Sequence, residues 1–167
     1  AKELKILTRE ILRGLPAVCS DFMLAIENTT QPLTRYAYAN DLKLFFNYLT
    51  SECPAFGSIE ISAITPADLS RVTARDLHMY MEYLGLYIKN DVEITNEALG
   101  KMRKLASLRS FYKYMFKNGL IESDVTQLID MPKRHEKPIL RMEIDEVARM
   151  LDYVESGETM NERQKKY

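Results

Sequence analysis

The sequence predicts an all-α protein, and three observations carry that prediction. Apolar residues recur at intervals of three and four along almost the whole chain, the spacing that places them on one side of a helix. Glycine and proline number only six each, so few positions interrupt helices. Residues 58–64 alternate apolar and polar side chains, but a single strand cannot satisfy its own backbone. We therefore expect helices and no β-sheet.

The totals are those of one ordinary domain, or of one domain with a piece of another. The chain has 167 residues, of which 46% are apolar and 28% are charged, close to the average for globular proteins. No apolar run approaches the ~18 residues of a membrane span, and the first residues lack the apolar centre of a signal peptide. We therefore expect a cytoplasmic protein that does not enter a membrane.

Cysteine and histidine are too few and too scattered to suggest a metal or redox site. Cys19 and Cys53 form no C-x-x-C pair, and His78 and His135 are separated from them and from each other. We expect both thiols to be free core residues, and we expect no metal and no other cofactor.

Three helices are predicted in the first part of the chain. The first covers residues 2–13 and ends at Gly14, and the second covers residues 17–27. The third begins with Thr34 as its N-cap and continues to Leu49. Its inward side is formed by Tyr38, Leu42, Phe45, Phe46 and Leu49.

Two capping sequences predict the helices that follow. Thr65 with Asp68, and Thr73 with Asp76, have the spacing at which a threonine caps a helix and the acid bonds back to the cap. The second cap opens a helix whose core-facing residues are Leu77, Tyr80, Leu84 and Tyr87.

A cationic helix is predicted over residues 96–117, after a polar loop. It closes at Gly119, which can take the left-handed conformation of a helix C-cap. A shorter helix follows at residues 123–129. In residues 130–140, two prolines bracket four charged residues and a histidine, which is typical of an interdomain linker.

The chain resumes with a helix over residues 141–156, whose apolar side is formed by Ile144, Val147, Leu151 and Val154. Residues 157–167 have no core of their own. We divide the chain into an accessory helix (1–14), a bundle (15–131), a linker (132–140) and the beginning of a second domain (141–167).

The cationic helix has an unusual composition. Residues 98–121 contain six lysines and arginines and no acid, although the whole chain has a formal charge of -1. Taking those six from the 23 cations leaves 17 against 24 acids, so one cationic segment belongs to an otherwise acidic chain. At 100° per residue, one broad apolar arc is formed by Leu105, Leu108, Phe111, Tyr112, Met115 and Phe116. The opposite side carries Arg103, Ser107, Ser110, Tyr114 and Lys117, with Lys113 and Arg109 along one edge and Lys104 along the other.

Two interpretations of this polar stripe stay open. Short hydroxyls between long cations suit a helix laid against a nucleic-acid duplex, where an acid would be repelled by the phosphates. A cationic helix face is also commonly just solvated. The linker favours the first interpretation, because Lys133, Arg134, Lys137 and Arg141 add a second cationic patch.

Four segments, in order, resemble the core-binding domain of tyrosine recombinases, the family of phage integrases and Xer-like proteins. They are TRYAYANDLKLFFNYL, ITPADLSRVTARDLHMYMEYL, RKLASLRSFYKYMFKNGLIESDVTQLIDMPK and LRMEIDEVARMLDYVE. The resemblance covers roughly residues 17–155. Its most specific part is RKLASLRSFYKYM followed by NGLI and MPK, which is similar to the family's last core-binding helix and its linker.

The resemblance implies a SAM-like bundle of four to five helices that forms half of a clamp around double-stranded DNA at a recombination core site. It also implies that other recombinase protomers join on that DNA. In the family, cleavage and rejoining through a 3′-phosphotyrosine belong to a C-terminal domain, of which this chain would hold only the first helix. We therefore expect no catalytic residue and no catalysis from this chain, while its parent would be a tyrosine recombinase.

The resemblance also implies contact residues, position by position. The DNA-binding candidates are Thr34, Arg35, Tyr36, Lys43, Lys101, Arg103, Lys104, Ser107, Ser110, Lys133, Arg134 and Lys137. Arg109 lies near the core edge and could equally be a structural ion-pair partner. We expect Arg103→Glu with Lys104→Glu to abolish DNA binding with little loss of helix. The alternative is a helical protein-interaction module whose basic face meets an acidic partner.

Overall fold

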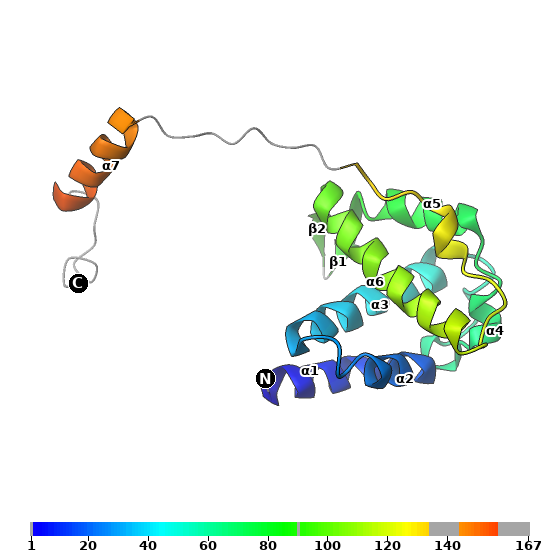
Figure 1. The fold of residues 1–167 in the computed structure, drawn as a ribbon. Helices are drawn as coiled ribbons and strands as arrows, with labels where there is room; N and C mark the ends of the chain where they lie inside the picture. The colour runs from blue at the N-terminus through cyan, green and yellow to red at the C-terminus, as the bar shows by residue number, and fades with distance from the viewer. Residues whose placement is uncertain (1, 90, 134–143, 157–167) are drawn as a thin grey trace. The chain divides into compact units, whose positions relative to one another are not determined.

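The computed structural model describes residues 2–89, 91–133 and 144–156, which fall in two compact units, Ala1–Arg134 and His135–Tyr167. In the first unit the α-helices are α1 (Lys2–Leu12), α2 (Ala17–Ala25), α3 (Pro32–Glu52), α4 (Pro66–Leu69), α5 (Ala74–Tyr83) and α6 (Ala98–Lys117) (Figure 1). Two short 3₁₀ helices, η1 (Ile61–Ala63) and η2 (Val125–Leu128), complete its helical content. The predicted all-α class is confirmed, with one small hairpin as an exception.

The core is a set of aromatic rings between α3 and the helices around it. Phe45 packs edge-on against Tyr80 of α5, with ring centroids 5.2 Å apart, and Phe46 packs against Phe111 of α6 at 6.3 Å. Phe22 of α2 lies 5.5 Å from Phe111. All five rings are at most 1% exposed. These contacts fix α6 across α3, since rings of this size bury large apolar areas.

The first helix is packed onto the bundle. α1 lies along α3 (Figure 1), and Thr8 is buried on its inner side, where its hydroxyl donates to the Leu4 carbonyl at 2.7 Å. The predicted free cysteines are confirmed as buried core residues.

Both predicted capping boxes are confirmed. The Thr65 hydroxyl accepts from the Asp68 amide, the Asp68 carboxylate accepts from the Thr65 amide, and Thr73 repeats this arrangement with Asp76. The N-cap expected at Thr34 is wrong. α3 begins at Pro32 with Gln31 as its cap residue, because proline is favoured in the first helical turn, where its missing N–H costs nothing.

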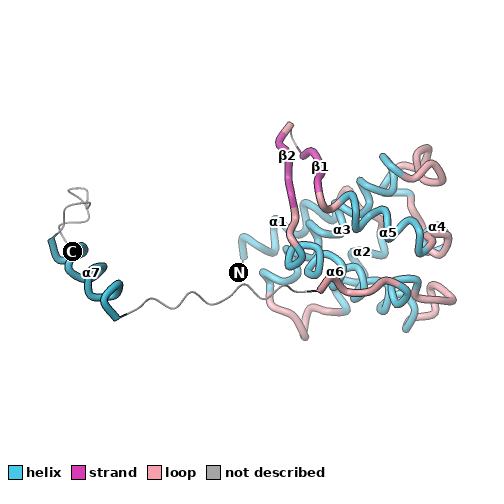
Figure 2. Tube along the Cα trace, turned by 90° about the horizontal axis from the view of Figure 1, so that it is seen from above, coloured by secondary structure: helices cyan, strands magenta, loops and turns pink. Residues whose placement is uncertain are grey.

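The expected polar loop before α6 is also wrong. Strands β1 (Leu86–Lys89) and β2 (Val92–Thr95) form an antiparallel hairpin, which extends from the edge of the bundle in Figure 2. Asp91 has a φ of 60°, a left-handed conformation that aspartate tolerates better than most residues. Tyr87 pairs with Ile94 across the strands, and Tyr87 is buried at 8% exposure.

The C-terminal end of α6 matches its prediction. Gly119 has a φ of 67° and donates to the Phe116 carbonyl, while the Leu120 amide donates to the Met115 carbonyl at 2.9 Å. This pair of bonds is the Schellman motif. Phe116 was expected in the core but is 50% exposed.

In the second unit, α7 (Ile144–Ser156) confirms the predicted last helix. Its side chains at Val147, Met150 and Leu151 are 38%, 50% and 54% exposed. The division into accessory helix, bundle, linker and second domain stays a prediction. None of the described helices combines the length and apolarity needed to cross a membrane.

Candidate nucleic-acid interface

Three of the six cations of α6 donate hydrogen bonds to other groups of the bundle. The first is Arg103, whose two terminal nitrogens donate to the two carboxylate oxygens of Asp41 on α3, at 2.6 and 2.8 Å. The Asp41 side chain is 3% exposed, whereas that of Arg103 is 48% exposed. Burial raises the pKa of the Asp41 carboxyl more than the Arg103 guanidinium lowers it. This bidentate pair joins α3 to α6.

The second is Lys104, which is only 8% exposed. Its ammonium donates to the Asn96 side-chain oxygen at 2.8 Å, and the Asn96 amide donates to the Leu84 carbonyl at 2.9 Å. Ser107 is 1% exposed and donates to the Lys104 carbonyl at 2.8 Å. The expectation that Lys104 and Ser107 face outward is therefore wrong.

The physical reason is that two helices cover this side of α6. Asp41 of α3 reaches Arg103, and Phe22 of α2 packs against Tyr114 with ring centroids 5.6 Å apart. A helical wheel gives the relative angles of the residues of α6, but it does not say which edge of the polar arc neighbouring helices cover. The exposed side is rotated away from Ser107 toward Lys113.

The third cation is Arg109, which donates to the backbone carbonyls of Thr126 and Ile129. It fastens the segment around η2 to α6. The structural alternative for Arg109 is thus supported, with carbonyl oxygens as partners rather than a carboxylate.

On α3, Arg35 is buried at 8% exposure. It donates to the carbonyls of Glu27 and Thr30 at 2.6 and 3.0 Å and lies 3.6 Å from the Glu27 carboxylate. Arg35 therefore holds the turn between α2 and α3, contrary to the expectation of a contact residue. Thr34 and Tyr36 are half-buried, and Lys43 is exposed.

The surface left uncovered on α6 is a stripe at three- and four-residue intervals, which we call the α6 stripe: Arg103, Ala106, Ser110, Lys113 and Lys117. Lys113 and Lys117 are exposed and make no ion pair within 4.0 Å with any described residue. Sequence reasoning placed Lys113 only at the edge of the stripe. Its place in the uncovered stripe depends on the neighbours of α6, which no local signal reveals.

Two predicted contacts lie apart from the α6 stripe. Lys101 is half-buried beside Gly85, and Lys133 is exposed at the end of the first unit. Arg134 and Lys137 lie outside the described residues. Within the described residues, no group of three His, Cys, Asp or Glu side chains could hold a metal ion.

Fold and surface together define a small helical bundle with an uncovered, acid-free helix stripe, a class suited to binding a polyanion. Comparison with known proteins shows which proteins the chain is similar to. The curated tyrosine recombinase XerC of Caldanaerobacter subterraneus is 28% identical over 149 residues, which is 84% of this chain and 40% of that protein. The XerC of Chlorobaculum tepidum is 30% identical over 134 residues, 79% of this chain and 36% of that protein.

A XerC of Leptospira interrogans is 28% identical over 130 residues, 78% of this chain and 36% of the relative. This chain is therefore related to the tyrosine recombinases, and the family resemblance is confirmed. The chain spans about 40% or less of the length of these relatives. No family model and no solved structure matches it.

Proposed function

We propose that the bundle of residues 15–131 is a DNA-binding module of a tyrosine recombinase and clamps duplex DNA at a recombination core site. The relationship to tyrosine recombinases supports the class of function. The observation that carries the proposal for this chain is the α6 stripe, where exposed cations and a hydroxyl lie on a helix without a single acid.

The chemistry of the α6 stripe suits a phosphate backbone. Lys113 and Lys117 are long cations that reach phosphates, Ser110 donates a hydrogen bond, and Ala106 permits close approach of the helix. An acid at any of these positions would repel the DNA.

Arg103 has a double role in this proposal. A guanidinium has five N–H donors, and Asp41 engages two of them. The half of Arg103 that remains exposed can donate to a phosphate or a base edge while Asp41 holds its orientation. The pair thus prepositions a DNA contact.

The residues that we propose as DNA contacts differ from the twelve candidates of the sequence analysis. We propose Thr34, Tyr36, Lys43, Lys101, Arg103, Ser110 and Lys133 from the original candidates, joined by Lys113 and Lys117. Arg35, Lys104 and Ser107 support these residues from inside the bundle. Arg134 and Lys137 remain predictions for the linker.

We further propose that the complete recombinase cuts and rejoins DNA through a 3′-phosphotyrosine, assembles from several protomers on DNA and works in the cytoplasm. In this proposal the present segment binds and positions DNA, while catalysis belongs to the remainder of the parent protein. The chain alone is expected to leave supercoiled plasmid unrelaxed.

Binding to a fluorescent duplex, followed by anisotropy across salt concentrations, tests the proposed function. With about six phosphate contacts, affinity should lie near the non-specific range of ~10⁻⁴ to 10⁻⁶ M, and the log–log slope against salt should be about -5. Failure to bind any duplex at low salt would contradict DNA binding. It would favour the alternative of a protein-interaction module.

A further inference from the structure

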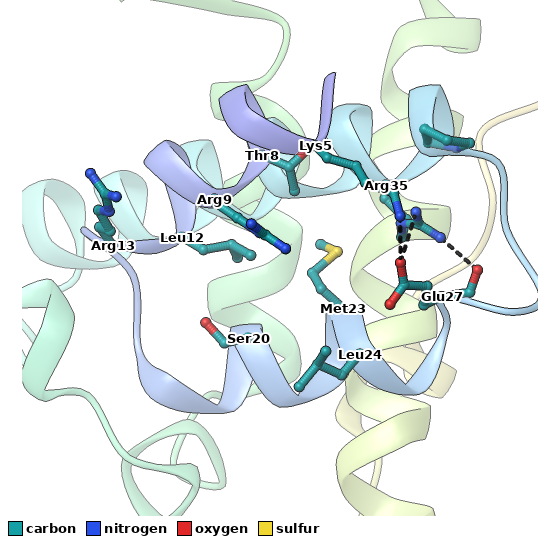
Figure 3. Close-up of a pocket in the computed structure, with 11 residues that line it drawn as sticks. Lys5, Thr8, Arg9, Leu12, Arg13, Ser20, Met23, Leu24, Glu27 and Arg35 are labelled. Carbon is teal, nitrogen blue, oxygen red and sulfur yellow. Dashed lines mark hydrogen bonds and ion pairs between the residues drawn. The ribbon is translucent and has the colours of Figure 1, made fainter. Parts of the chain in front are cut away.

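A groove runs between α1 and α2, on a part of the bundle that the α6 stripe does not include. It encloses about 430 Å³ and is lined by residues of α1, α2 and the start of α3 (Figure 3). Leu12, Met23 and Leu24 supply an apolar floor, and Leu24 is 68% exposed. An apolar side chain this open is available to a partner.

Cations of α1 and of the turn directly after it gather on the groove side. Lys5, Arg9 and Arg13 line the groove at four-residue intervals, which spans about 12 Å along the helix at 1.5 Å per residue. The acids Glu3 and Glu10 fall on another side of the same helix. α1 thus presents a row of positive charge above an apolar floor.

The acid at one end of the groove is already neutralised. The Glu27 carboxylate lies 3.0 Å from the Lys5 ammonium and 3.6 Å from Arg35. The hydrogen bond from Lys5 lowers the pKa of Glu27, so the carboxylate is ionised at neutral pH. Arg9 and Arg13 form no ion pair within 4.0 Å with any residue that the structure describes.

We propose that this groove binds an acidic amphipathic helix of a partner protein. A phosphate backbone would use the cations but leave the apolar floor unfilled. A compact anion would likewise leave the apolar floor unfilled. A helix with acids at i and i+4 beside an apolar stripe matches both Arg9 with Arg13 and the floor.

Titration of the full chain with a labelled synthetic peptide tests this inference. The probe is a 16-residue helix (roughly four turns) with leucines at i, i+3, i+4 and i+7 and glutamates along one flank. Anisotropy should report saturable binding, and amide chemical shifts should move in α1 and α2. The same peptide with glutamine in place of glutamate should bind about tenfold more weakly or not at all.

Two groove variants and one control locate the contact. Arg9→Glu with Arg13→Glu should weaken peptide binding at least about tenfold. Leu24→Gln, at a position that is 68% exposed, should leave the circular dichroism spectrum native and weaken peptide binding severalfold. The control, Arg75→Glu with Arg149→Glu, reverses two exposed cations elsewhere and should change nothing.

Absence of peptide binding, or equal loss in the control, overturns the inference. So does a groove variant that loses binding to duplex DNA or anionic phospholipid vesicles while the acidic peptide fails to bind, since the groove would then serve a polyanion. The DNA-binding proposal is tested separately, by variants of the α6 stripe, so failure of the peptide to bind leaves it standing.

Discussion

The pair Asp41–Arg103 predicts an asymmetric response to mutation. Arg103→Met leaves the Asp41 carboxylate, whose side chain is 3% exposed, without its ion-pair partner. Removal of one partner from a buried ion pair costs about 3–5 kcal/mol of stability. Asp41→Asn keeps the shape of the side chain and leaves Arg103, 48% exposed, in contact with water. The loss is then that of charge-assisted hydrogen bonds, about 1.5–3 kcal/mol.

Urea and thermal unfolding at pH 7, followed by circular dichroism, measure this difference. Arg103→Met should lower Tm by roughly 10–15 °C, and Asp41→Asn by roughly half as much. The double variant should lose less than the two single losses together, because each removes the same contact. Equal single losses, or a larger loss for Asp41→Asn, would refute the assignment of Asp41 as the buried partner.

The pH dependence of stability tests the Asp41–Arg103 pair independently. The pKa of Asp41 is raised above its ordinary value of 3.8, so the folded state favours the protonated carboxyl. That stabilisation is present below the unfolded pKa and is lost as pH rises through the folded pKa. Without the Arg103 guanidinium the folded pKa rises further. The deficit of Arg103→Met relative to wild type should therefore shrink between pH 7 and pH 4, and a constant deficit would argue against a buried ionised Asp41.

Further predictions concern stability and reactivity. Arg109→Met and Arg109→Lys should each cost about 1.5–3 kcal/mol in urea unfolding, since neither side chain reproduces the two bonds to Thr126 and Ile129; full rescue by lysine would contradict this. Gly119→Ala should cost about 1 kcal/mol from its φ of 67° alone, and Gly119→Asn less. Thr73→Ala should cost about 1 kcal/mol and Thr73→Ser little; equal losses would mean that the cap contributes nothing. Burial raises the pKa of the Cys19 thiol, so an aromatic disulfide reagent at pH 8 should label Cys19 only as the chain unfolds, and a fast native-state reaction would show an accessible thiol.

Features set by neighbouring residues could be predicted from the sequence. The Thr73–Asp76 cap lies within four residues and the glycine end of α6 within six, so the local pattern specifies them. The hairpin could not be predicted from the sequence. Tyr87 of β1 and Ile94 of β2 form a cross-strand pair, but two strands this short give little signal against the helical spacing around them.

Features set by packing could not be predicted. Arg103 and Asp41 are 62 residues apart, and nothing near either residue indicates its partner. Half of the positive charge of α6 proves to be structural, since Arg103, Lys104 and Arg109 all bind groups within the bundle. The lack of acids in α6 therefore has two causes, internal hydrogen bonding and the proposed contact with DNA.

This result changes the decisive experiment. Arg103→Glu with Lys104→Glu would place a second acid against buried Asp41 and remove the lysine that binds Asn96, so loss of DNA binding could follow from unfolding. Lys43 and Lys113 are exposed on α3 and α6 and make no ion pair within the described part of the chain, so their reversal spares the core.

The most direct measurement is therefore the salt dependence of duplex binding for Lys43→Glu with Lys113→Glu, compared with the charge-matched control Arg75→Glu with Arg149→Glu. The account predicts that the first variant loses affinity and about two units of log–log slope, while the control retains both within error. Equal behaviour of the two variants, with native circular dichroism, would contradict DNA binding through α3 and α6.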